Sequence, residues 1–268
     1  MIIRIVLGRW YISALLGGAS CAEPFYDDNI GVEGVKIDEG ALAGTFALKG
    51  NGVDQADTAI GKVDTGGRSF YRSQRTFNVD TKVYDETLTL CAVENFETAG
   101  LQTTNNPAAI AAIPEVSTTI DVDHATGAYT RATFFEYWAI QGLGDTEPLP
   151  RDVNDDVYFD SDADGHPGAT VFTQGLVPNG EVYIAQRKKV SATGVVRGVD
   201  KVFGLLASKK EGIVLAANNN FLLTEAVRVP HPDPKESWWI EIRIDDDGGC
   251  AEVEQARDDD DLPLRRPF

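Results

Sequence analysis

The chain has few basic residues and few histidines, and these shortages limit the classes of function that it can have. It contains 24 Lys and Arg, 3 His and 42 Asp and Glu, which leaves a formal net charge of -18 at pH 7. Such a surface repels phosphate backbones, so we expect no nucleic-acid partner. An acidic surface attracts cations, including divalent metals, and it also keeps a protein soluble. Both interpretations of the acidity stay open.

Motifs of the common enzyme classes are also missing. The chain has no Gly-x-Ser-x-Gly elbow, no phosphate-cradling loop and no His-Glu-x-x-His zinc helix. The strongest catalytic hypothesis is a carboxylate pair, Glu136 in an aromatic run and Glu181, which would suit a glycan-active enzyme. A glutamate that faces solvent, or one that pairs with Arg187, explains Glu136 without catalysis. We therefore expect a non-catalytic protein.

Long apolar runs are scarce, and the one near the start of the chain is informative. Arg4 supplies an early positive charge, residues 10–16 are apolar, and the small residues 17–20 lead to Cys21. This order is typical of an export signal over residues 1–20. It resembles a lipobox, the motif that precedes the acylated cysteine of bacterial lipoproteins. The resemblance implies that Cys21 carries a lipid anchor to the membrane.

The resemblance also bears on location. Ala22 after the cysteine implies an outer-membrane lipoprotein, and a periplasmic or cell-surface protein is the broader expectation. Residues 21–40, which are acidic and rich in glycine, fit a lipidated cysteine followed by a flexible spacer.

Only three cysteines occur, and an odd number in an exported protein needs an explanation. If Cys21 is lipidated, Cys91 and Cys250 remain. An oxidising compartment favours a disulfide between them over two unpaired thiols. In the chain-entropy model a bridge across so long a loop contributes roughly 5 kcal/mol.

Residues 41–250 have the pattern of a mainly β domain. Segments rich in β-branched and aromatic residues are separated by Gly, Asn and Asp, and few stretches have helical periodicity. The expected strands are 68–79, 82–96, 128–140, 169–173, 181–190, 194–207 and 237–244. We also expect a hairpin turn at 122–128, a short helix within 107–114 and a disordered acidic tail at 251–268. Strands at this spacing predict a single antiparallel β-barrel or β-sandwich.

The sharpest chemical feature lies within residues 152–170. Asp160, Asp162 and Asp164 alternate, and Gly165 follows them. Three carboxylates packed this closely repel one another unless a cation lies between them. Calcium is a hard cation that binds six to eight oxygens, and alternate carboxylates around a tight turn supply several of these. The pattern predicts a calcium loop, and a solvated acidic loop without metal is the alternative.

This loop resembles the first half of an EF-hand loop, and it is similar to loops of dockerins and thrombospondin type 3 repeats. The resemblance implies ligation by the side chains of Asp160, Asp162 and Asp164 and by the carbonyl of His166. It ends there, because Val171 stands where an EF-hand has a bidentate glutamate. Asp156, with its neighbours, is the nearest candidate for the missing ligand. We expect a structural ion of weak affinity, on the order of 10⁻⁴ to 10⁻³ M. Together with the lipobox and the late cysteine, this loop gives the chain a resemblance to uncharacterised bacterial lipoproteins.

A second functional hypothesis is a lipocalin-like carrier of a small apolar ligand. In a closed barrel, aromatic residues such as Phe134, Tyr137, Trp138 and Tyr183 could line a cavity. Such aromatics more often fill a core. An enclosed apolar cavity would favour the carrier, and a filled interior would not.

Overall fold

The computed structural model describes residues 31–58, 61–175, 179–219, 222–223, 228–259 and 261–263. The expected signal peptide and Cys21 lie outside these residues. The strands are β1 (Gly44–Thr58), β2 (Gly61–Phe77), β3 (Tyr84–Asn95), β4 (Leu101–Asn105), β5 (Val116–Asp123), β6 (Ala128–Trp138), β7 (Ala169–Gly175), β8 (Gly180–Gly198), β9 (Lys201–Ala217), β10 (Arg228–Pro230) and β11 (Trp238–Arg243). The helices are α1 (Pro107–Ala111), the 3₁₀ turn η2 (Pro234–Glu236) and α2 (Cys250–Asp258).

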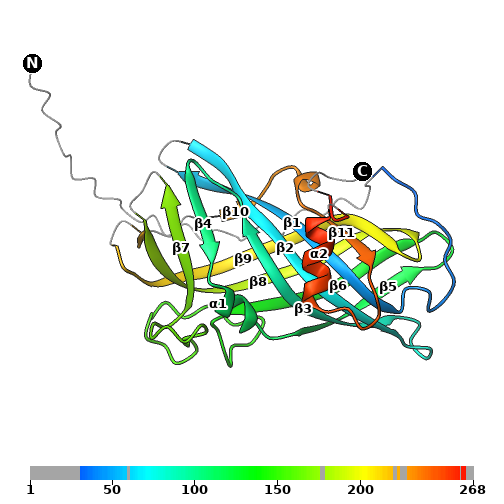
Figure 1. Ribbon diagram of the computed structural model, residues 1–268, viewed down its shortest axis with the longest axis horizontal. Coiled ribbons are helices and arrows are strands. Elements are labelled where there is room, and N and C mark those ends of the chain that lie inside the picture. Colours follow the sequence, from blue (N-terminus) through cyan, green and yellow to red (C-terminus); the bar gives the residue numbers. More distant parts are fainter. Residues whose placement is uncertain are drawn as a thin grey trace, which may run out of the picture.

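The strands form one antiparallel sheet that closes on itself. The pairing order runs β8-β6-β5-β3-β2-β1-β11-β9, and β9 pairs back onto β8. Within the described residues, eight strands therefore make a closed barrel, which is elongated in Figure 1. The predicted antiparallel β domain is confirmed, and its architecture is a barrel.

The partners of the long strands change along the barrel. β8 pairs with β6 through Gln186–Val195 and with β7 through residues 180–184. In the same way, β1 pairs first with β11 and then, over Asp54–Ala56, with β10. β7 continues the sheet to β4. We call the end formed by β4, β7 and β10 the far end; it lies on the left of Figure 1.

The other end is closed by residues 31–43, and we call it the plugged end. The amides of Val35 and Ile37 donate to the carbonyls of Val196 and His124, both at 3.0 Å. Ile37 and Leu42 are buried inside the ring. Residues 31–40 therefore differ from the expected flexible spacer, because Ile37 and its neighbours bury apolar surface against the barrel.

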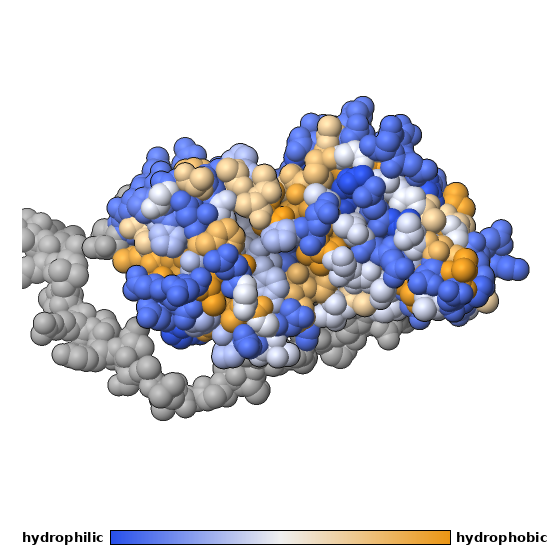
Figure 2. All heavy atoms as spheres, turned by 90° about the horizontal axis from the view of Figure 1, so that it is seen from below, coloured by the Kyte–Doolittle hydropathy of each residue, from blue (hydrophilic) through white to orange (hydrophobic). Residues whose placement is uncertain are grey.

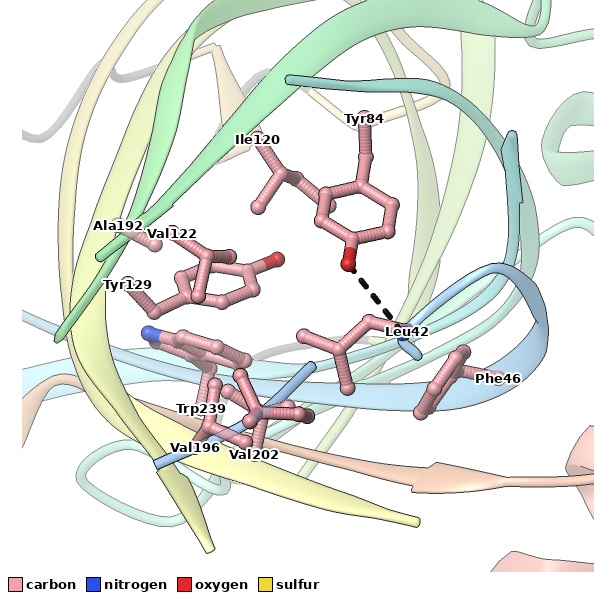
Figure 3. Close-up of a cluster of buried hydrophobic side chains, with 11 residues drawn as sticks. Leu42, Phe46, Tyr84, Ile120, Val122, Tyr129, Ala192, Val196, Val202 and Trp239 are labelled. Atoms are coloured by element: carbon pink, nitrogen blue, oxygen red, sulfur yellow. Dashed lines mark hydrogen bonds between the residues drawn. The ribbon is translucent and has the colours of Figure 1, made fainter. Parts of the chain in front are cut away.

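An apolar layer fills the barrel near this plug (Figure 3). The hydroxyl of Tyr84 accepts a hydrogen bond from the amide of Leu42 at 3.4 Å. The rings of Tyr129 and Trp239 pack with their centroids 4.9 Å apart. Other members of the layer are Phe46, Ile120, Val122, Ala192, Val196 and Val202. Side chains thus occupy the axis of the barrel at this level.

Next to the apolar layer lie four charged side chains that are fully buried. Arg131 donates to both carboxylate oxygens of Glu86, at 2.7 and 3.0 Å. Arg75 pairs with Glu86 at 3.3 Å, and both arginines pair with Glu241. Burial alone would raise the pKa of Glu86, but Arg131 and Arg75 hold that pKa below its usual value. Each of these four buried charges therefore has a partner of opposite sign, as burial requires.

Helix α2 covers the outside of the wall (Figure 1). Val253, Ala256 and Leu262 pack on a face that includes Phe70 and Trp238. The sequence predicts a disordered tail from residue 251, and the structure differs over 251–259. The reason is that apolar positions three apart bury one side of a helix on the barrel. Residues 260 and 264–268 lie outside the described residues.

Alternation along the strands sets the two faces of the wall. On β11, Trp239 and Glu241 point inside, while Trp238 and Ile240 lie under α2. This is the alternation of side chains that a β-strand imposes. One strand prediction, 194–207, is wrong, because the turn between β8 and β9 falls inside it. From below, the outer surface carries interspersed hydrophilic and hydrophobic residues (Figure 2).

Candidate metal centre

The acidic loop forms a compact turn before β7. Gly168 closes it: its amide donates to the carbonyl of Phe159 at 2.9 Å, and its carbonyl accepts from the amide of Ser161 at 3.1 Å. Ala163 and Gly165 have φ of 59° and 92°, and the left-handed region suits glycine at such a turn. The expected exit into a strand is confirmed, since β7 begins at Ala169.

The turn brings the three predicted aspartates together. One carboxylate oxygen from each of Asp160, Asp162 and Asp164 lies within 4.8 Å of the others. The amides of Gly165 and Asp164 donate to Asp160 at 2.8 and 3.2 Å. These N–H groups outweigh burial and lower the pKa of Asp160. Asp160 is therefore held in its charged form, which is the form that binds a cation.

One carboxylate oxygen of Asp162 has a hydrogen-bond partner, and the other has none. Its Oδ2 accepts from the amide of Thr170 at 2.9 Å. Its Oδ1 is shielded from solvent and has no hydrogen-bond partner. A buried carboxylate oxygen without a partner is costly, and a cation between the carboxylates would remove that cost.

Thr170 is a site residue that sequence reasoning did not single out. In addition to its amide contact with Asp162, its hydroxyl donates to Asp164 at 2.7 Å. Its carbonyl accepts from Asn106, the N-cap of α1, at 2.9 Å. In the sequence, Thr170 is marked only by its place two residues after Gly168, where the acidic loop ends. The loop is thereby linked to β7 and to α1.

His166 and Tyr183 form one side of the site. Their rings stack with centroids 4.2 Å apart, and the hydroxyl of Tyr183 donates to Glu181 at 2.9 Å. Burial, Glu181 and the carboxylates of Asp164 and Asp162 raise the pKa of Tyr183 to about 12. The imidazole of His166 thus packs on a tyrosine, and ligation by its carbonyl stays a prediction.

The other predicted ligand is not part of the cluster. Asp156 is exposed and does not belong to the group of described acidic side chains that could hold a metal ion. Its role as a ligand stays a prediction. Val171, at the position where an EF-hand has glutamate, is a buried residue of β7. The structure therefore holds a half-loop of three carboxylates that could bind a metal ion.

The cysteine prediction is confirmed. Cys91 on β3 and Cys250 at the start of α2 form a disulfide, with their Cα atoms 5.2 Å apart. The bond ties the helix that covers the wall to the wall itself. A disulfide is consistent with an exported protein.

The suspected catalytic pair does not converge. Glu136 lies inside the barrel, where it accepts from Tyr71 and from the indole of Trp138, both at 2.7 Å. Its cross-strand neighbour is Lys188, seven positions along β8 from Glu181. At about 3.3 Å per residue this is roughly 23 Å. Glycosidase carboxylates lie about 5 to 9.5 Å apart.

The surroundings of the four aromatic residues test whether they line one cavity, as the carrier hypothesis expects. Phe134 and Trp138 belong to a filled core cluster, whereas Tyr137 contacts a loop outside the wall and Tyr183 contacts His166. The four aromatics do not share one chamber. The carrier hypothesis gains no support from them and stays a prediction.

No helix within the described residues combines the length and apolarity needed to cross a bilayer. Comparisons with protein-family models, curated proteins and solved structures find no match to the chain.

Proposed function

We propose that the protein is a non-catalytic, exported and lipid-anchored envelope protein whose acidic loop binds calcium as a structural ion. The observation that carries the proposal is the cluster of Asp160, Asp162 and Asp164, in which Asp162 Oδ1 is buried and has no hydrogen-bond partner. The ion would fasten the start of β7 through Thr170, which bonds to two of these aspartates.

Calcium suits the cluster better than other metals. All the side-chain atoms that converge are carboxylate oxygens, the ligands that hard cations prefer. The nearest imidazole, His166, is stacked on Tyr183, so a nitrogen-rich site for a transition metal finds no support. The few charged ligands and the exposed loop favour weak binding, as for calcium modules outside cells.

Export and anchoring rest on two separate features. The disulfide between Cys91 and Cys250 supports an oxidising compartment. The small residues before Cys21 support acylation of that cysteine. Fractionation of cells that express the wild type and Cys21→Ser tests the anchor. We expect the wild type with membranes and the variant in the soluble fraction, and equal distribution would contradict the proposal.

Thermal unfolding with and without calcium tests the ion site. At 10 mM calcium and the expected affinity, binding should contribute about 1.4 to 2.7 kcal/mol, or a rise in Tm of about 3 to 10 °C. Asp162→Asn keeps the acceptor for Thr170 but removes charge, so it should abolish the rise. Asp121→Asn, at an exposed aspartate of β5 outside the loop, is the matched control and should keep it. A Tm of the wild type that does not respond to calcium would exclude the site.

A further inference from the structure

A groove of about 630 Å³ lies on β1, β2, β3 and β5, beside the loop before α2. Strand alternation places it on the outside of the barrel. On β2, Ser73 and Arg75 point inside to Glu86, so Gln74 and Thr76 face outward into the groove. The groove is therefore separate from the barrel interior and from the acidic loop.

Its floor is a grid of polar side chains set by strand register. Thr45 lies opposite Gln74, Gln74 opposite Thr87, and Thr87 opposite Ser117. At a strand spacing of about 4.8 Å this row spans roughly 14 Å. A second row crosses Thr76, Asp85 and Thr119. The rows offer hydroxyl, amide and carboxylate groups at regular intervals.

Most of these groups have no partner in the described part of the protein. The side chains of Gln74, Thr76, Thr87 and Thr119 make no hydrogen bond there. The hydroxyl of Thr89, by contrast, donates to Glu115 at 2.6 Å. These four side chains lie on the groove floor, where a ligand can reach their donors and acceptors.

One wall of the groove is held firmly. The amide of Ile244 donates to the carbonyl of Thr45 at 3.0 Å, and the hydroxyl of Thr45 donates to the carbonyl of Asp246 at 2.9 Å. Arg72 donates to the carbonyl of Gly248 at 2.6 Å. The disulfide at Cys250 fixes the end of the same loop. A preformed wall reduces the entropy that binding would cost.

The charges and polar groups that line the groove indicate what kind of ligand it can bind. Asp85 and Asp246 are exposed carboxylates at the groove, and the guanidinium of Arg75 is turned inside, so an anion would be repelled. Threonine presents a methyl group beside a hydroxyl, which matches the C–H and O–H groups of a sugar. Carboxylates accept hydrogen bonds from hydroxyls. We propose that this groove binds an uncharged oligosaccharide.

Titration calorimetry with neutral oligosaccharides tests the site, using oligomers of glucose and of N-acetylglucosamine, with oligogalacturonate as the anionic comparison. We expect saturable binding of a neutral oligomer and none of the anionic one. Thr87→Val and Thr119→Val keep the shape and β propensity of threonine, and each should weaken binding about two- to tenfold. Thr104→Val, an exposed threonine on β4 at the far end, is the matched control and should leave the affinity unchanged.

A second measurement does not depend on variants. In amide NMR spectra of the wild type, the neutral oligomer should shift the signals of Gln74, Thr87 and Thr119, and leave that of Thr104 in place. Absence of saturable binding across the neutral panel would overturn the proposal. Binding that ignores both valine variants, or shifts that lie elsewhere, would overturn it equally.

Discussion

Arg131 and Glu86 form a two-point ion pair inside the barrel, with Nε 2.7 Å from Oε2 and Nη2 3.0 Å from Oε1. Both side chains are buried, on β6 and β3, and β5 lies between these strands in the sheet. The pair therefore joins parts of the wall that are not neighbours in the hydrogen-bonded ladder.

Removal of both partners should cost less than the sum of the two single removals. Arg131→Met leaves the charge of Glu86 buried with less compensation, so we expect a loss of about 3 to 5 kcal/mol in the free energy of unfolding. In the double variant with Glu86→Gln the loss should be smaller than the sum of the single losses. Urea unfolding of the four proteins measures the coupling. Additive losses would show that the two residues act independently.

Acidification should destabilise the fold through Glu86. Because Arg131 and Arg75 lower its pKa in the folded state, the folded protein holds this proton less tightly than the unfolded chain. The stabilisation is present above the unfolded pKa of about 4.3 and is lost as pH falls through the folded pKa. Unfolding free energies between pH 7 and pH 3 should fall more steeply for the wild type than for Glu86→Gln. Parallel curves would contradict this assignment.

Tyr183 provides a spectroscopic report on the acidic loop. Its ring stacks on His166, and Asp162 and Asp164 contribute to its raised pKa, so it lies beside the site. Terbium, which binds at calcium sites, should luminesce when tyrosine is excited. Asp162→Asn should abolish this signal, and Tyr183→Leu should weaken it while calcium still raises the Tm. A signal that survives Asp162→Asn would place the ion elsewhere.

The disulfide should hold α2 against the wall. Replacement of Cys91 and Cys250 by alanine should lower the free energy of unfolding by about 2 to 5 kcal/mol. Hydrogen exchange should increase first at Val253 and Ala256, whose helix loses its covalent tie. The amides of β8 should be affected only through global stability. Uniform exchange over both elements would indicate that α2 does not open separately.

Local features of the chain could be predicted because their causes are local. Asn106 and Pro107 predict the start of α1, and the structure confirms that Asn106 accepts from the amide of Ala108. Gly127 predicts the turn between β5 and β6, where its φ is 72°. Glycine marks the turn between β8 and β9 less clearly, because strong β formers continue on both sides of Gly198. The predicted strand 194–207 therefore runs through this turn, which lies between Gly198 and Lys201.

The sequence by itself determined the antiparallel β class, the cysteine pair and the three clustered aspartates. Alternation of residue types makes strands, and three aspartates in five residues meet in any tight turn. The cysteine pair follows from the count of three, with Cys21 set aside for the lipid. Only the tertiary structure decided that Glu136 and Glu181 lie far apart and that Gln74 and Thr87 lie side by side. Strand register sets those distances, and register depends on how all the strands pair around a closed wall.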